Sequence, residues 1–163
     1  MSVYSGFPSS LNAMGALKEV LEERKGRGIK DDEGKKPSAT SSDRLKLGEQ
    51  KLSKLNSEQV ASAKKYWRDV CPELLQFTLE YGYGGIFSRD NLSIKHRQIA
   101  TIAAGLTALG TGVQQLKFHI KGALNIGISK EEINEIMLLM SVYAGFPASD
   151  QWNSCAERSN HRT

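Results

Sequence analysis

Apolar side chains recur every three or four positions over most of this chain, which is the spacing of a helix that buries one face. No segment alternates apolar and polar residues over six positions, and β-branched residues do not cluster, so no strand is expected. The pattern therefore predicts an all-α fold with about six helices. The clearest apolar stripes are Leu11, Met14, Leu17 and Leu21; Ile99, Ile102, Ala103 and Leu106; and Ile133, Ile136, Met137 and Met140.

Local signals mark the ends of some of these helices. Ser129 and Glu132 have the spacing of a capping box, and Ile128 and Ile133 have the spacing of a hydrophobic staple. Ser93 is placed to cap a central helix whose apolar residues cover more than one face. These signals predict helix starts near positions 94 and 130.

Between positions 44 and 92 the signals are weaker. The charged segment 45–55 predicts one or two helical turns, and Asn56 with Gln59 forms a possible capping box for the next helix. Pro72 suits the first turn of a further helix. The glycines at 82, 84 and 85 are expected to end that helix.

A polar segment separates the first helix from the others. Between Gly26 and Asp43 the only large apolar residue is Ile29, so the segment cannot bury enough surface to offset its ordering entropy. We therefore expect four parts. They are an N-terminal helix over 1–25, a flexible linker over 26–43, a helical domain over 44–153 and a polar tail over 154–163.

A short repeat relates the two ends of the chain. Residues 2–10 and 141–149 are identical at seven of nine positions. Chance, or a helix-ending turn common to both, is the alternative explanation. The first copy leads into the apolar stripe of the N-terminal helix, whereas the second leads into polar residues. We infer that residues 2–25 resemble the end of a preceding copy, and that this helix closes either its own domain or that of a neighbour.

Composition and charge narrow the classes of function. The 22 basic and 18 acidic residues give a net charge of +4, a mild excess that does not indicate nucleic-acid binding. The longest uncharged run, 98–116, is too polar for a membrane span, and the first residues lack the features of a signal peptide. Cys71 and Cys155 form no metal or redox spacing. We expect a cytoplasmic protein with neither nucleic acid nor membrane as a partner.

Several motifs follow one another along the second half of the chain. They are YGGIFSR at 83–89, LSIKHRQIA at 92–100, QLKFHIKGALNIGIS at 115–129, EEINEI at 131–136 and YAGFPA at 143–148. In this order and spacing they resemble the carboxymuconolactone decarboxylase family over roughly residues 44–153. The resemblance implies an alkylhydroperoxidase D-like helical bundle that assembles into trimers or hexamers.

The resemblance implies one of two chemistries. Decarboxylase members remove carbon dioxide from 4-carboxymuconolactone in aromatic-acid breakdown without a cofactor, whereas peroxidase members use a Cys-x-x-Cys pair followed by a histidine. This chain has the histidine, His119, but Gly112 and Gln115 occupy the cysteine positions, so the thiolate nucleophile is missing. We therefore expect a cofactor-free decarboxylase of a small carboxylated lactone. A non-catalytic helical oligomer of the same fold is the alternative, and peroxide reduction is disfavoured.

Decarboxylation needs a cation for the substrate carboxylates, a donor for the dienolate and an acid that protonates carbon. The candidate catalytic residues are Arg97 as the carboxylate clamp, His119 as general acid or donor, and Glu135 as proton carrier or as the group that orients His119. An ion pair, a core histidine and a surface glutamate are the structural alternatives. The candidate substrate-binding residues, which supply positive charge or apolar lining, are Arg89, Lys95, Tyr83, Phe87, Tyr143 and Phe146. No metal site is expected.

Overall fold

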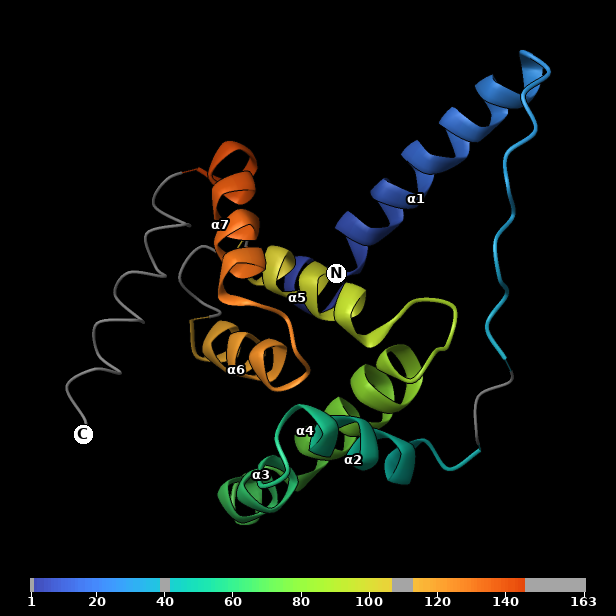
Figure 1. Ribbon diagram of the computed structural model, residues 1–163. Coiled ribbons are helices and arrows are strands. Elements are labelled where there is room, and N and C mark those ends of the chain that lie inside the picture. The colour runs from blue at the N-terminus through green and yellow to red at the C-terminus, as the bar shows by residue number, and fades with distance from the viewer. Residues whose placement is uncertain (1, 39–41, 107–112, 146–163) are drawn as a thin grey trace.

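The computed structural model describes residues 2–38, 42–106 and 113–145, and these ranges contain seven α-helices, one π-helix and no strand (Figure 1). The all-α prediction is confirmed. In chain order the helices are α1 (Ser2–Gly26), α2 (Arg44–Leu55), α3 (Gln59–Trp67), α4 (Pro72–Phe77), η1 (Thr78–Phe87), α5 (Ile94–Leu106), α6 (Val113–Asn125) and α7 (Lys130–Ala144).

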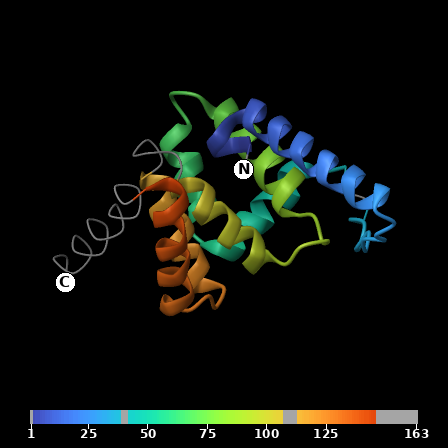
Figure 2. The same cartoon turned by 90° about the horizontal axis from the view of Figure 1, so that it is seen from above.

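The helices form two groups, with α1 projecting from them (Figures 1 and 2). One group, α5 to α7, surrounds a core of Ile102, Leu116, Ile120, Ala123, Ile128, Ile133 and Met137. The other, α2 and η1 with α3 and α4, surrounds a smaller core of Leu52, Leu55, Leu79 and Tyr83. Ile126 packs against both cores and connects them. Within the described ranges, no helix is long and apolar enough to cross a membrane.

The backbones of α2 and η1 approach each other closely because both helices carry a glycine at the contact. A Cβ atom added at Gly48 would overlap the backbone carbonyl of Leu79, and one added at Gly84 would overlap that of Arg44. The prediction that the glycines at 82–85 end a helix is therefore wrong. The chain continues through them as the π-helix η1 to Phe87, because side chains are absent where α2 packs against it.

The helix formed by segment 45–55 is longer than the one or two turns predicted, and it contributes buried side chains to the core. It forms α2, a helix of 12 residues, in which Leu52 and Leu55 are buried. Asp43 caps this helix by accepting a hydrogen bond from the backbone N–H of Lys46. The helix forms despite its many charged residues because its two buried leucines pack in the smaller core against η1.

Most of the predicted helix starts are confirmed. Ser129 and Glu132 form the capping box of α7, and Ile128 and Ile133 are both buried in the larger core, as a hydrophobic staple requires. Ser93 Oγ accepts a hydrogen bond from the backbone N–H three residues later, at the start of α5. The capping box proposed for Asn56 is wrong, because α3 begins at 59 and the Asn56 side chain accepts from the backbone N–H of residue 58.

The two glycines of the repeat have nearly the same backbone conformation. Gly6 interrupts α1 with φ 78° and ψ 163°, and Gly145 ends α7 with φ 83° and ψ 157°. A positive φ of this size is readily adopted by glycine and rarely by other residues. At its glycine, the repeat is therefore seen in the backbone conformation as well as in the sequence.

We expect alanine to be tolerated at one glycine of η1 and not at another. Gly84→Ala should lower the free energy of unfolding by about 3 kcal/mol, because the added methyl group meets the backbone of α2. Gly82→Ala is the matched control: its Cβ would meet nothing within 4 Å, so helix propensity should raise stability by up to ~1 kcal/mol. Urea denaturation of both variants measures the difference, and equal effects would contradict the close packing.

Candidate functional site

His119 and Gln98 form a buried polar pair between α6 and α5. His119 is 6% exposed and Gln98 is fully buried. The Gln98 side-chain amide donates to the backbone carbonyl of His119 over 2.6 Å. His119 Nδ1 lies 3.1 Å from Gln98 Nε2 and 3.3 Å from Gln98 Oε1, so it accepts from or donates to the amide according to the ring tautomer. The amide thus holds both the backbone and the ring of His119.

Aromatic rings surround the imidazole on two sides. Phe87, the last residue of η1, stacks on it with a centroid distance of 6.3 Å and an interplanar angle of 23°. Phe118 meets it edge-on at 5.2 Å. Of the predicted apolar residues, Phe87 therefore lies next to His119, and Tyr83 packs against Phe87 with a centroid distance of 5.3 Å.

Burial changes the charge state of His119. Desolvation lowers its pKa from 6.5 to about 4. At neutral pH the imidazole is therefore uncharged, and it can offer an N–H donor but holds no extra proton to release. This favours the donor role of His119 over the general-acid role.

Arg97 lies at the start of α5, one position before Gln98. Its guanidinium donates through Nη2 to Asn91 Oδ1 over 2.9 Å, and its Nε is buried without a hydrogen-bond partner among the described residues. Partial burial lowers the pKa of Arg97, the positive charge of Arg89 lowers it further, and Asp90 opposes these effects. Arg97 and Arg89 are thus close enough for their positive charges to interact.

Residues of the predicted linker form hydrogen bonds to the carboxylate of Asp90. Lys35 Nζ lies 2.9 Å from Asp90 Oδ2, and Ser38 donates to the same carboxylate through its backbone N–H and its hydroxyl, over 2.8 and 2.7 Å. These hydrogen bonds hold the pKa of Asp90 well below its usual range. The linker therefore reaches the loop before α5, which carries Arg89 and Asp90.

The other predicted residues lie in different surroundings. Lys95 donates to the backbone carbonyl of Gly127 over 2.7 Å, a structural contact after the end of α6. Glu135 and Tyr143 are exposed on α7, so they do not share the buried environment of His119. Phe146 lies outside the described residues. Within the described ranges, no group of three or more histidine, cysteine, aspartate or glutamate side chains could hold a metal ion.

Comparison with known protein families identifies a family whose matched region includes the buried histidine and the motifs around it. The profile of the carboxymuconolactone decarboxylase family matches residues 72–157, slightly more than half of the chain. The chain belongs to this family. The matched region of this family member contains α4 to α7 and all the candidate site residues.

Two relatives of this carboxymuconolactone decarboxylase family member carry the name of a decarboxylase. The chain is 32% identical over 103 residues to 4-carboxymuconolactone decarboxylase of Acinetobacter baylyi, covering 63% of this chain and 75% of the relative. It is 30% identical over 94 residues to nitrosuccinic acid decarboxylase of Metarhizium robertsii, covering 58% and 64%. An uncharacterised protein of Paracoccus denitrificans is 36% identical over 79 residues, covering 48% and 59%.

Gln98 is the site residue that the sequence analysis did not single out. It lies four positions from both Ile94 and Ile102, so it occupies a core position on the apolar side of α5. A polar side chain at such a position needs a hydrogen-bond partner, and that requirement is the signal that could have identified it.

We expect His119 to make this family member less stable in acid. The histidine pKa is about 4 in the folded chain against 6.5 without burial, so the unfolded chain binds the proton more readily. Stability is therefore full above pH 6.5 and decreases as the pH falls toward 4, by at most about 3 kcal/mol. Urea denaturation at pH 7 and pH 4.5 measures this loss.

Carboxylates also contribute to the loss of stability in acid. The loss of unfolding free energy between pH 7 and pH 4.5 in the wild type, minus the same loss in His119→Gln, gives the contribution of this histidine alone. The exposed His96, changed to glutamine, is the matched control and should leave the pH dependence as in the wild type. The same acid destabilisation in His119→Gln as in the wild type would contradict the lowered pKa.

Proposed function

We propose that this chain is a cofactor-free carboxy-lyase that decarboxylates a small carboxylated lactone in aromatic-acid catabolism. The observation that carries the proposal is the uncharged His119, held by Gln98 and stacked on Phe87. The decarboxylase names of two relatives support it. A cytoplasmic location and assembly into trimers or hexamers are parts of the same proposal.

In the proposed reaction the bond between the lactone ring and its carboxylate breaks, and its electron pair moves into the conjugated carbonyl as a dienolate. Carbon dioxide leaves, and a proton is then added to carbon. An uncharged imidazole donates a hydrogen bond to the dienolate oxygen, and the apolar surroundings of His119 strengthen that bond. The tautomer in which Nδ1 accepts from Gln98 places the ring proton on Nε2.

The hydrogen bonds of Gln98 to His119 support assigning the positioning of the ring, one of the two roles considered for Glu135, to Gln98 instead. The role that remains for Glu135 is to carry the proton that is added to carbon. Its exposed place on α7 allows it to exchange protons with water. Glu135→Gln therefore tests proton delivery separately from stabilisation of the dienolate.

Arg97 supplies the cation in this proposal. Its guanidinium donates a hydrogen bond to the neutral Asn91, and the nearby Asp90 is already bonded to Lys35 and Ser38, so the charge of Arg97 stays available to a substrate carboxylate. Arg89, exposed and close enough to affect the pKa of Arg97, adds to the attraction for an anion. Since Arg97 and Gln98 are consecutive on α5, one helix positions both the clamp and the group that holds His119.

An ultraviolet assay of 4-carboxymuconolactone consumption by the purified full chain tests the proposal. His119→Gln should lower kcat/KM by roughly 100-fold, because the dienolate loses its donor. Arg97→Gln should raise KM by about tenfold or more, and Arg97→Lys should restore part of this loss because a cation remains. His96→Gln, an exposed histidine on the same helix as Arg97, is the matched control and should retain wild-type activity.

Three outcomes would contradict the proposal. Full activity of His119→Gln would make His119 a structural core histidine. Inactivity of the correctly folded wild type toward a panel of acidic lactones would favour a non-catalytic helical module. Turnover of peroxide that is lost on replacing Cys71 and Cys155 with serine would favour thiol chemistry instead.

A further inference from the structure

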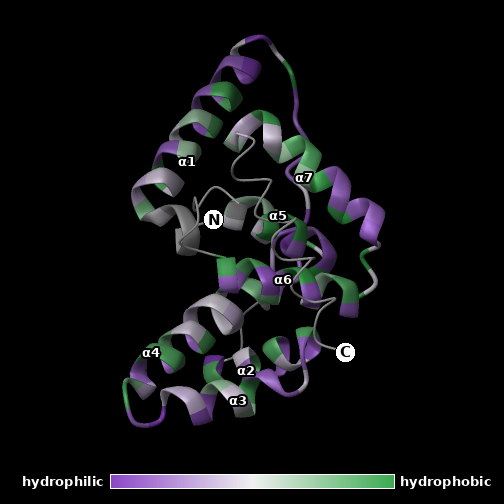
Figure 3. Cartoon of the chain, turned by 90° about the vertical axis from the view of Figure 1, so that its left-hand side faces the viewer, coloured by the Kyte–Doolittle hydropathy of each residue, from purple (hydrophilic) through white to green (hydrophobic). Residues whose placement is uncertain are grey.

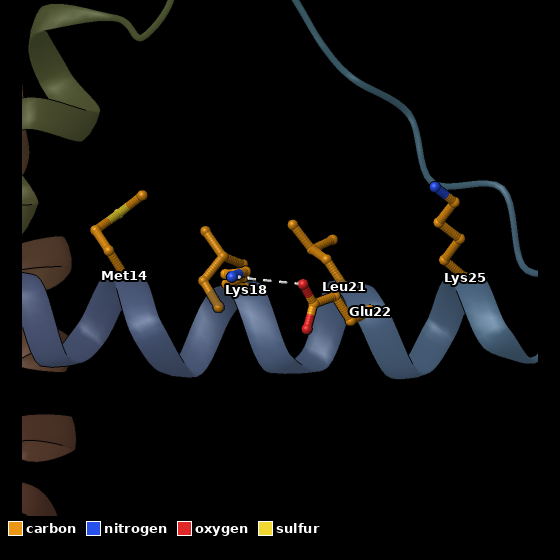
Figure 4. A pocket seen from close by; sticks show the side chains of 6 residues that line it. Met14, Lys18, Leu21, Glu22 and Lys25 are labelled. Carbon is orange, nitrogen blue, oxygen red and sulfur yellow. Dashed lines mark ion pairs between the residues drawn. The ribbon is translucent and has the colours of Figure 1, made fainter.

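The projecting helix α1 has an apolar side that the described part of the chain leaves exposed. Leu11 is 69% exposed and Met14 62%, and Leu17 and Leu21 on the same side are also exposed. A shallow groove runs along this side of the helix (Figure 4). It is lined by Met14, Leu17 and Leu21 together with Lys18, Glu22 and Lys25. Near its start α1 contacts the rest of the chain, where the ring of Phe7 lies 5.9 Å from that of Tyr81.

A second exposed apolar side lies on α7. Leu138 and Leu139 are about 60% exposed, and Val142 is 76% exposed and Tyr143 78%. The opposite side of α7 is the buried one, where Ile133 and Met137 enter the larger core. In Figure 3, where hydrophobic residues are green, green segments are seen on both α1 and α7. The chain thus presents two unpartnered apolar helix faces.

The repeat indicates that these two apolar faces can pack against each other. Residues 2–10 repeat 141–149, and the glycines at 6 and 145 share one backbone conformation. In the repeated unit, a helix of the α7 type is therefore followed directly by a helix of the α1 type. After Pro147, however, the sequence reads ASDQWNSCAERSN and does not repeat the stripe of α1. An α7-type helix therefore has its natural neighbour in α1.

Charge patterns support an antiparallel arrangement of the two helices. The groove side of α1 is apolar along its length, at Leu11, Met14, Leu17 and Leu21, and its two lysines, Lys18 and Lys25, lie in the second half of the helix. The exposed side of α7 is acidic in its first half, at Glu131 and Glu135, and apolar in its second, at positions 138–143. When the helices run in opposite directions, the apolar second half of α7 meets the part of α1 that holds Leu11 and Met14. The lysines in the second half of α1 then lie beside the glutamates of α7. Glu22 on the same side of α1 is already paired with Lys18 over 3.7 Å.

We propose that α1 of one copy of this chain docks antiparallel on the exposed face of α7 in a second copy. Within one chain both faces stay exposed, so exchange of α1 between copies buries both. The segment between α1 and α2 contains 17 residues, from 27 to 43, and is long enough to let α1 project from the body to which it belongs (Figure 1).

Sedimentation-equilibrium analysis of the full chain tests this proposal. Leu17→Glu on α1 and Leu139→Glu on α7 should each raise the dissociation constant of the assembly at least tenfold, with helix content unchanged by circular dichroism. Val70→Glu is the matched control, since Val70 is also an exposed apolar residue, at 77%, but lies on neither helix. It should leave the dissociation constant unchanged.

Cross-linking identifies which faces meet. In a Cys71→Ser, Cys155→Ser background, a tagged Met14→Cys chain mixed with an untagged Leu139→Cys chain should give mixed dimers with a flexible bis-maleimide, and Val70→Cys should not. A monomeric wild type, or an assembly weakened by Leu139→Glu but not by Leu17→Glu, would overturn the proposal. So would cross-links within one doubly substituted chain, which place α1 on its own α7, or dimers of Met14→Cys alone, which pair α1 with α1.

Discussion

The arrangement of α5, α6 and α2 depends on one buried amide, that of Gln98. It bonds to the backbone carbonyl and the ring of His119, and a buried amide left without partners would cost about 1–3 kcal/mol. Gly122 makes room for it, because a Cβ there would lie 3.2 Å from Gln98 Nε2 and 3.1 Å from Leu55 Cβ. Only a narrow range of helix positions satisfies both the hydrogen bonds and this close packing. The place of the imidazole follows from that requirement.

The π-helix supplies the other half of the surroundings of His119. Because α2 packs directly on the glycine-rich part of η1, Phe87 at its end reaches the imidazole while Tyr83 remains in the smaller core. The stacking ring excludes water from one side of His119, and this desolvation lowers the histidine pKa. A feature of backbone packing thereby sets the charge state of a candidate catalytic group.

The features that depend on neighbours in sequence could be predicted, and those that depend on distant contacts could not. The capping box of Ser129 needs only Glu132, three positions away, and was predictable. The spacing of Gln98 to Ile94 and Ile102 marks it as a polar residue at a core position, but its partner lies 21 positions later on another helix, so no local pattern identifies that partner. The π-helix likewise depends on the contact between Gly84 and Arg44, and glycine in a sequence otherwise indicates a helix end.

The charge around Arg97 supports the proposal that a small anion binds at this end of α5. Lys35, Arg89 and Arg97 are three cations near one carboxylate, Asp90, and that carboxylate is already hydrogen-bonded to Lys35 and Ser38. Two positive charges thus lack an acidic partner in this cluster, and partial burial of Arg97 reduces screening by water. Binding a carboxylate there would relieve the repulsion between the arginines. This imbalance, more than the net charge of +4, favours an acidic substrate.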